Sequence, residues 1–183
     1  MVKKRLSIEQ CCLAALLCTL LIVSTLLLRF TIPGTTVLMT TQLFFVMLYA
    51  LLFPARLTLS AIGVYTLLGL VGLPVFSGVC GPGVLLTPSF GYLAGFFAAA
   101  FSCSQLVKRK ANKWLAAGAG LGAFYLVALP CIGLIVPSQT LAAFLAAYCL
   151  PFLPLDILKP VLAVFAADRV EKLLPPHSGR CVR

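Results

Sequence analysis

Long apolar runs alternate along the whole chain with short breaks that are polar or contain Pro and Gly. A helix that crosses a bilayer needs roughly 20 predominantly apolar residues. Six runs come near that length, and we expect six transmembrane helices at about 10–28, 37–53, 57–73, 89–107, 114–136 and 155–174. The breaks between them fall at Pro33-Gly34, Pro54, segment 74–88, the basic cluster 108–113 and Pro137. The pattern predicts an all-α integral membrane protein, with residues 1–183 forming one membrane domain.

Two further segments on the expected outer side do not fit a plain helical bundle. Segment 74–88 is too apolar for an ordinary loop, and it contains Gly78, Gly81 and Gly83. Non-helical backbone at membrane depth persists where it is buried in protein or lines a cavity. We therefore expect a folded outer loop here, whose glycines contribute to a substrate site. Segment 141–150 is apolar but is separated from the last run by Pro151 and Pro154, which predicts a short outer helix.

Composition and charge support the membrane class. Hydrophobic residues make up 62% of the chain and charged residues 10%, against about 45–50% and 25% in soluble domains. The net charge of +10 does not indicate nucleic-acid binding, because no basic stripe carries aromatic stacking positions. With a cytoplasmic N-terminus, only Arg29 and Lys159 of the 14 Lys and Arg residues fall outside the cytoplasmic side. The positive-inside rule then predicts two cytoplasmic termini, and we expect a bacterial cytoplasmic membrane with lipid as the surrounding partner.

Asp156 and Lys159 are the most informative residues, because they lie in an apolar run of a chain with only four acidic residues. Intramembrane ionisable residues indicate a functional site by default, and positions three apart share one helix face. A carboxylate accepts hydrogen bonds and an ammonium donates them, so the pair can hold a ligand that presents both N–H and C=O groups. The alternative is a structural ion pair that fixes the last helix. The two folded outer segments favour the ligand site.

Other polar and small residues give weaker indications. Gln42 contacts the ligand or forms a hydrogen bond between helices, Tyr92 can reach the same cavity, and Tyr65 belongs to the core. The small residues Ala14, Ala15 and Cys18 lie on the first helix at spacings that permit another helix to approach closely. The chain carries no nucleotide-binding loop, no catalytic motif and no metal-ligand spacing. We therefore expect neither an enzyme nor a cofactor or metal.

Three stretches resemble the BioY family, the biotin-binding S components of energy-coupling factor (ECF) transporters: "TTQLFFVMLYALLFPARLTLSAIGVYTLLGLVGLPVF", "GVLLTPSFGYLAGFFAAAF" and "PFLPLDILKPVLA". The resemblance covers about residues 10 to 172 and implies a six-helix protein that captures biotin from outside. Asp156 and Lys159 fall on the family's Asp-x-x-Lys motif, which takes part in biotin binding, and Phe76 and Tyr92 would enclose the thiophane ring.

The same resemblance implies an energising membrane subunit and ATPases as partners. The chain departs from the family at Thr87–Tyr92, where the family has Gly-Pro-Thr-Gly-Gly-Tyr, and the family's outer amide and arginine have no assigned counterpart. Members of the family dock the energising subunit through an Ala-x-x-x-Ala face on the first helix. The nearest match to that face in this chain is Ala14 to Cys18. The alternatives are an S component for another vitamin and a membrane scaffold with a structural Asp-Lys pair. Whether the chain works alone, as a homodimer or with an energising module is left open by the sequence.

Overall fold

The fold is a bundle of helices running roughly along one direction, seen in a computed structural model that describes residues 8–27, 29–31, 38–136 and 140–173. The helices are α1 (Ile8–Leu26), α2 (Gln42–Leu52), α3 (Ala55–Leu70), α4 (Pro88–Lys108), α5 (Lys113–Ile135), α6 (Leu141–Tyr148) and α7 (Leu153–Leu173). A 3-10 helix, η1 (Pro82–Leu86), precedes α4, and strands β1 (Arg29–Thr31) and β2 (Leu38–Thr40) precede α2. The predicted all-α class is confirmed, since these two short strands are the exception among the described residues.

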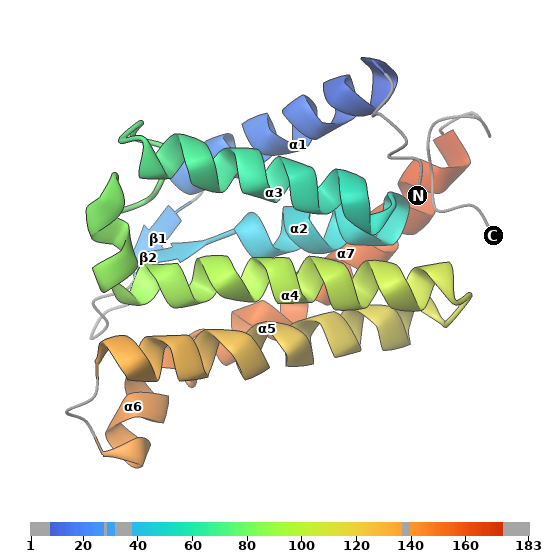
Figure 1. The fold of residues 1–183 in the computed structure, drawn as a ribbon. Coiled ribbons are helices and arrows are strands. Elements are labelled where there is room, and N and C mark those ends of the chain that lie inside the picture. The colour runs from blue at the N-terminus through green and yellow to red at the C-terminus, as the bar shows by residue number, and fades with distance from the viewer. Residues whose placement is uncertain (1–7, 28, 32–37, 137–139, 174–183) are drawn as a thin grey trace, which may run out of the picture.

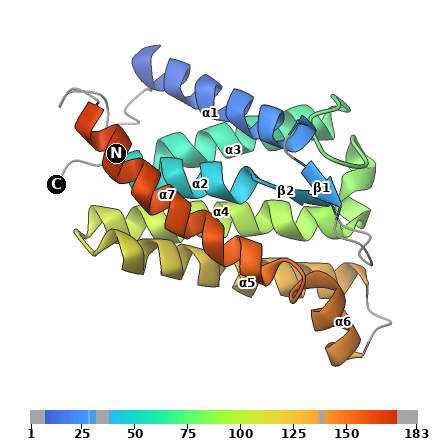
Figure 2. The ribbon, with the colours of Figure 1, turned by 180° about the vertical axis from the view of Figure 1, so that it is seen from behind.

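The elements form layers around α2. α1 packs on α3, α4 packs on α5 along most of their length, and α7 crosses behind α2 and α5 (Figures 1 and 2). Helices α1, α4 and α5 are long and apolar enough to cross a membrane. α2 and α3 are shorter apolar helices, and α7 has 21 residues but carries charged groups. The strands, η1 and α6 gather at one end of the bundle, away from the turn between α4 and α5.

Close packing of α4 on α5 depends on two glycines of α4. A Cβ atom on Gly91 would lie 2.4 Å from Ile132 Cγ1, and one on Gly95 would lie 2.8 Å from the Phe124 ring. Both distances are far inside the contact distance of carbon atoms, about 3.5–4.0 Å. Small residues that let backbones approach are a usual device between membrane helices, and here they position Phe124.

The six predicted spans correspond to α1, α2, α3, α4, α5 and α7, and the predicted short outer helix is α6. The prediction that a helix begins at 37 is wrong, because residues 38–40 pair with 29–31 as an antiparallel hairpin and α2 begins only at Gln42. An apolar run alone does not distinguish strand from helix. α3 begins and ends earlier than predicted, at Ala55 and Leu70. The predicted breaks at Pro33-Gly34 and Pro137 lie outside the described residues.

The outer loop predicted at 74–88 is folded, and its second half is η1. Gly81, the residue before η1, has φ +82°, a conformation that residues with a Cβ rarely adopt. Gly72, at the end of α3, has φ +105°. Gly78 and Gly83, in contrast, are not among the described glycines with positive φ. A left-handed backbone is therefore needed at Gly81 but not at the other two glycines predicted in this loop.

Candidate functional site: a buried pocket with two polar ends

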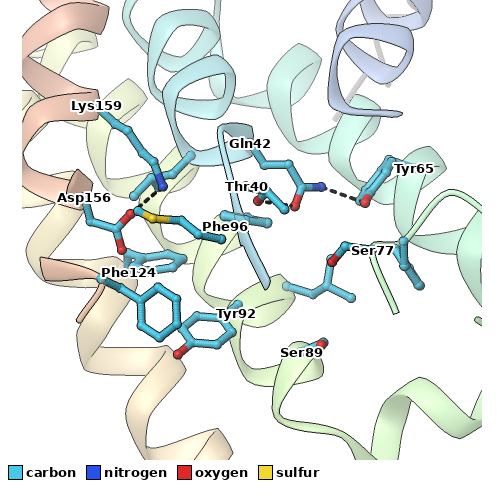
Figure 3. Close-up of a pocket in the computed structure, with 15 residues that line it drawn as sticks. Thr40, Gln42, Tyr65, Ser77, Ser89, Tyr92, Phe96, Phe124, Asp156 and Lys159 are labelled. Atoms are coloured by element: carbon cyan, nitrogen blue, oxygen red, sulfur yellow. Dashed lines mark hydrogen bonds and ion pairs between the residues drawn. The ribbon is translucent and has the colours of Figure 1, made fainter. Parts of the chain in front are cut away.

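A pocket lies next to β2 and the outer loop, and Figure 3 shows the side chains that line it. About 640 Å3 of space between its walls is free of protein atoms, and part of that space is open to solvent. Its lining comes from β2, α2, α3, the outer loop, α4, α5 and the start of α7. The lining residues are Met39, Thr40, Gln42, Leu43, Tyr65, Phe76, Ser77, Ser89, Tyr92, Leu93, Phe96, Phe124, Phe152, Asp156 and Lys159.

Asp156 and Lys159 form the charged end of the pocket. Both belong to the first two turns of α7, and the Lys159 Nζ donates to Asp156 Oδ1 at 2.6 Å. Asp156 is 4% exposed, and its second oxygen, Oδ2, accepts from the hydroxyl of Tyr125 on α5 at 2.7 Å. Both charged side chains line this one pocket, where their spacing of three residues predicts a shared face. The pair offers an acceptor and a donor side by side in a mostly apolar surrounding.

Gln42 and Tyr65 form the other polar end, across the pocket in Figure 3. The Gln42 Nε2 donates to the Tyr65 hydroxyl at 2.6 Å, and the Gln42 Oε1 accepts from the Thr40 hydroxyl at 2.9 Å. Tyr65 in turn donates to the carbonyl oxygen of Val75 at 3.1 Å and lies 3.2 Å from Thr25 Oγ1 on α1. Gln42 therefore makes the predicted hydrogen bond between helices and also lines the pocket. Tyr65 is buried, as predicted, but it too faces the pocket.

An aromatic wall joins the two polar ends. The Tyr92 and Phe96 rings of α4 each stack on Phe124 of α5, with centroid distances of 6.0 and 5.5 Å. Phe152 meets Tyr92 edge to face at 6.1 Å. The Tyr92 hydroxyl donates to the carbonyl oxygen of Tyr148 at 2.8 Å, which ties α4 to the end of α6. A wall of this kind suits the flat or ring-shaped apolar part of a ligand.

The outer loop closes one side of the pocket through Phe76 and Ser77. Phe76 lies directly on the Cα of Gly69, and its ring meets Tyr65 edge to face at 5.3 Å. The Gly81 N–H donates to the carbonyl oxygen of Gly69 at 2.8 Å, so the loop is held on α3 at two points. Gly78, Gly81 and Gly83, predicted as site residues, are not among the residues that line the pocket.

Several lining residues were not predicted from the sequence. They are Met39, Thr40, Leu43, Ser77, Ser89, Leu93, Phe96, Phe124 and Phe152, and Tyr125 behind Asp156 was also missed. Apolar and aromatic residues in the middle of a span give no signal that separates a pocket wall from ordinary core. The hydroxyl groups of Ser77 and Ser89 lie beside glycine- and proline-rich sequence, and that proximity was the one available indication.

The predicted docking residues of α1 differ in accessibility. Ala15 is exposed, Ala14 is half-buried, and Cys18 is 6% exposed within the core of the fold. Within the described part of the chain, no cluster of three His, Cys, Asp or Glu side chains could hold a metal ion. The pocket lining offers a ligand hydrogen bonds, charge and aromatic contact.

The chain is similar to a known protein family, to sequence relatives and to a solved structure. The sequence profile of the BioY family matches residues 1–176. A Thermotoga maritima protein described as "Biotin transporter BioY" is 37% identical over 146 residues, which cover 78% of this chain and 85% of that protein. A Pyrococcus horikoshii protein described as "Probable biotin transporter BioY" is 33% identical over 135 residues, covering 73% and 80%. The crystal structure of the S-component for biotin from an ECF-type ABC transporter shares the fold, with a TM-score of 0.78, 21% identity, and coverage of 90% of this chain and 92% of that one.

Proposed function

Because the chain belongs to the BioY family, we propose that it is a membrane-embedded subunit that binds biotin at the outer face and delivers it inward. The observation that carries the proposal is the ion pair of buried Asp156 with partly buried Lys159 at one end of an aromatic pocket. Two relatives at 37% and 33% identity are described as biotin transporters or probable ones, which supports the same ligand for this chain.

The ligand fits the two kinds of surface in the pocket. The ureido ring of biotin presents N–H and C=O groups along one edge, and Asp156 would accept from an N–H while Lys159 donates to the oxygen. Phe76 and Tyr92 would enclose the thiophane ring, with Phe124 behind Tyr92. A pocket of this kind rejects an analogue that lacks the ureido hydrogen bonds, because its own buried groups are then left unpaired.

The distribution of basic residues and the exposed face of α1 support a proposal for the orientation and the partners. Lys108, Arg109 and Lys110 are exposed at the turn between α4 and α5, at the end of the bundle opposite the strands and η1 (Figure 1). With that turn in the cytoplasm of a bacterial cell, the pocket faces outward and both termini are cytoplasmic. An energising membrane subunit with its ATPases would dock on α1 through the exposed Ala15 and Thr19 rather than through the buried Cys18. A homodimer is the alternative assembly.

Two other functions make different predictions. An S component for another vitamin keeps the pocket but prefers a ligand such as thiamine or riboflavin. A membrane scaffold uses Asp156 and Lys159 only as a structural ion pair, which their 2.6 Å contact also allows. In that case removal of both charges together would be tolerated, whereas removal of one would leave a buried unpaired charge.

The test is uptake of labelled biotin by bacterial cells that lack their own biotin transporter and express this chain, with and without an ECF energising module. The proposal predicts accumulation that unlabelled biotin suppresses and that thiamine or riboflavin at the same concentration does not. Suppression by one of those vitamins would support the other S-component function. Absence of uptake under both conditions, with the chain present in the membrane, would contradict the transport function.

A further inference from the structure

Tyr125 is placed behind the charged end of the pocket rather than in its lining. On an α-helix, successive residues point about 100° apart because 3.6 residues complete one turn. Phe124 uses one direction to face the pocket, and Tyr125 uses the next to reach α7. The Tyr125 hydroxyl donates to Asp156 Oδ2 at 2.7 Å, while its ring meets the Phe124 ring nearly at right angles, with centroids 5.2 Å apart.

The Asp156 carboxylate accepts a hydrogen bond on each of its two oxygens. A carboxylate has two oxygens and about four lone-pair sites. Lys159 occupies a site on Oδ1 and Tyr125 occupies one on Oδ2. Each carboxylate oxygen therefore accepts a hydrogen bond from a different helix, Oδ1 from α7 itself and Oδ2 from α5. The remaining lone pairs of the carboxylate are available to the pocket that Asp156 lines.

The contact also fixes the plane of the carboxylate. The terminal torsion of an Asp side chain is broad, so Lys159 alone, with its flexible stem, leaves the plane free to turn. A second donor on the other oxygen, from a helix packed against α7, removes that freedom. The direction of the free lone pairs, and with it the direction from which an N–H can bind, is then set before the ligand arrives.

We propose that Tyr125 is a positioning residue for ligand recognition, which orients the Asp156 carboxylate toward one N–H of a cyclic urea without touching the ligand. The inference rests on the proposed function, since it assigns the acceptor of the ureido N–H to Asp156. It predicts that the Tyr125 hydroxyl contributes to affinity only for ligands that carry that N–H. A tyrosine that only packs α5 on α7 would affect all ligands of the pocket equally.

The experiment measures the affinity of detergent-purified parent and Tyr125→Phe for biotin and for two biotins methylated on one or the other ureido nitrogen. The methylated biotin that loses more affinity for the parent identifies the N–H that faces Asp156. The ratio of its dissociation constant to that of biotin is then compared between parent and variant. Because both ligands bind only the folded fraction of each preparation, the ratio does not depend on how much of the variant is folded. Tyr49→Phe is the matched control, since Tyr49 is a buried tyrosine of α2 outside the pocket lining.

The expected result is that Tyr125→Phe weakens biotin binding by roughly tenfold, the lower limit for loss of a hydrogen bond to a charged group, and leaves binding of the methylated biotin nearly unchanged. The ratio then falls by about the same factor, while Tyr49→Phe leaves it at the parent value. Equal losses for both ligands, or an unchanged affinity for biotin, would overturn the positioning role. If the folded parent does not bind biotin, that result needs no variant, and it would overturn the proposed function together with this inference. It is thereby distinguished from a failure of the positioning role, which appears only in the comparison of variant and parent.

Discussion

Gly69 on α3 holds the outer loop in place by having no side chain, and Gly69→Ala tests that role. A Cβ atom at this position would lie 2.1 Å from Cζ, 2.2 Å from Cε2 and 2.6 Å from Cε1 of Phe76. Carbon atoms in contact lie about 3.5–4.0 Å apart, so the Phe76 ring would have to retreat by about 1.4 Å or more. Phe76 is buried and lines the pocket, with Tyr65 on another side of its ring.

The free-energy change follows from two opposing effects. Extra atoms in a well-packed site destabilise by about 1–3 kcal/mol, while Gly→Ala within a helix stabilises by about 0.5–1 kcal/mol. We expect a net loss of up to roughly 2.5 kcal/mol in the free energy of unfolding. Displacement of the Phe76 ring also changes the shape of the pocket, and we expect biotin to bind about tenfold more weakly, equivalent to about 1.4 kcal/mol.

The assay combines thermal unfolding in detergent, followed by circular dichroism, with a biotin titration. Gly63→Ala is the matched control on the same helix, because nothing lies within 4 Å of its Cβ position. That variant should melt slightly higher than the parent and bind biotin equally well. Adding Phe76→Leu to Gly69→Ala should restore part of the lost stability, since the smaller side chain relieves the overlap. The reasoning is refuted if Gly69→Ala matches Gly63→Ala in both melting temperature and affinity.

Substitutions at three further positions test local features by the same melting assay. Thr58 is fully buried, and its hydroxyl has no hydrogen-bond partner within the described residues. Thr58→Val should therefore raise the free energy of unfolding by about 1 kcal/mol. A melting temperature below that of the parent would contradict this expectation. Asn112 caps α5 by accepting from the Trp114 N–H at 3.1 Å, so Asn112→Ala should lose about 1 kcal/mol whereas Asn112→Ser retains most of the cap. Lys110 has φ 60°, a backbone conformation that costs a residue with a Cβ atom about 1 kcal/mol. Lys110→Gly should therefore raise the free energy of unfolding by about 1 kcal/mol, whereas Lys110→Ala should not. Equal effects of the two substitutions would argue against backbone strain at this position.

The lengths of the apolar runs predicted most of the helices because membrane helices must match the bilayer and satisfy their own backbone hydrogen bonds. α5 differs from its predicted span by one residue at each end, and α4 likewise. In both cases a local signal coincides with the boundary, since Asn112 caps α5 and Pro88 is the first residue of α4. The sequence therefore carries two agreeing indications at these positions.

The hairpin could not be predicted in the same way. Residues 38–40 are apolar or β-branched and continue directly into α2, so hydrophobicity assigns them to the helix. Their strand conformation depends on pairing with residues 29–31, and that pairing is a tertiary contact that no local pattern records. As a consequence β2, which supplies Met39 and Thr40 to the pocket, was absent from the predicted site.

The site was predictable where charge made residues unusual. Asp156 and Lys159 stood out because ionisable groups are rare in apolar runs, and their spacing predicted a shared face. Tyr125 and Phe124 were not found, because an aromatic residue in the middle of a span has the same local sequence whether it packs in the core or lines a pocket. Their roles depend on how α5 turns against α7 and α4, which the two close-packed glycines of α4 help to set.

Calorimetric titration of the purified chain with biotin tests whether Asp156 and Lys159 hold biotin in this pocket. We expect saturable binding with one biotin per chain, weakened by at least about 100-fold in Asp156→Asn and in Lys159→Ala, because each substitution removes a charged group that is proposed to bind the ureido ring. We also expect that the variant with both substitutions stays folded and still does not bind tightly. A folded parent that gives no binding, or a double variant that binds biotin as the parent does, would contradict this role of the pair.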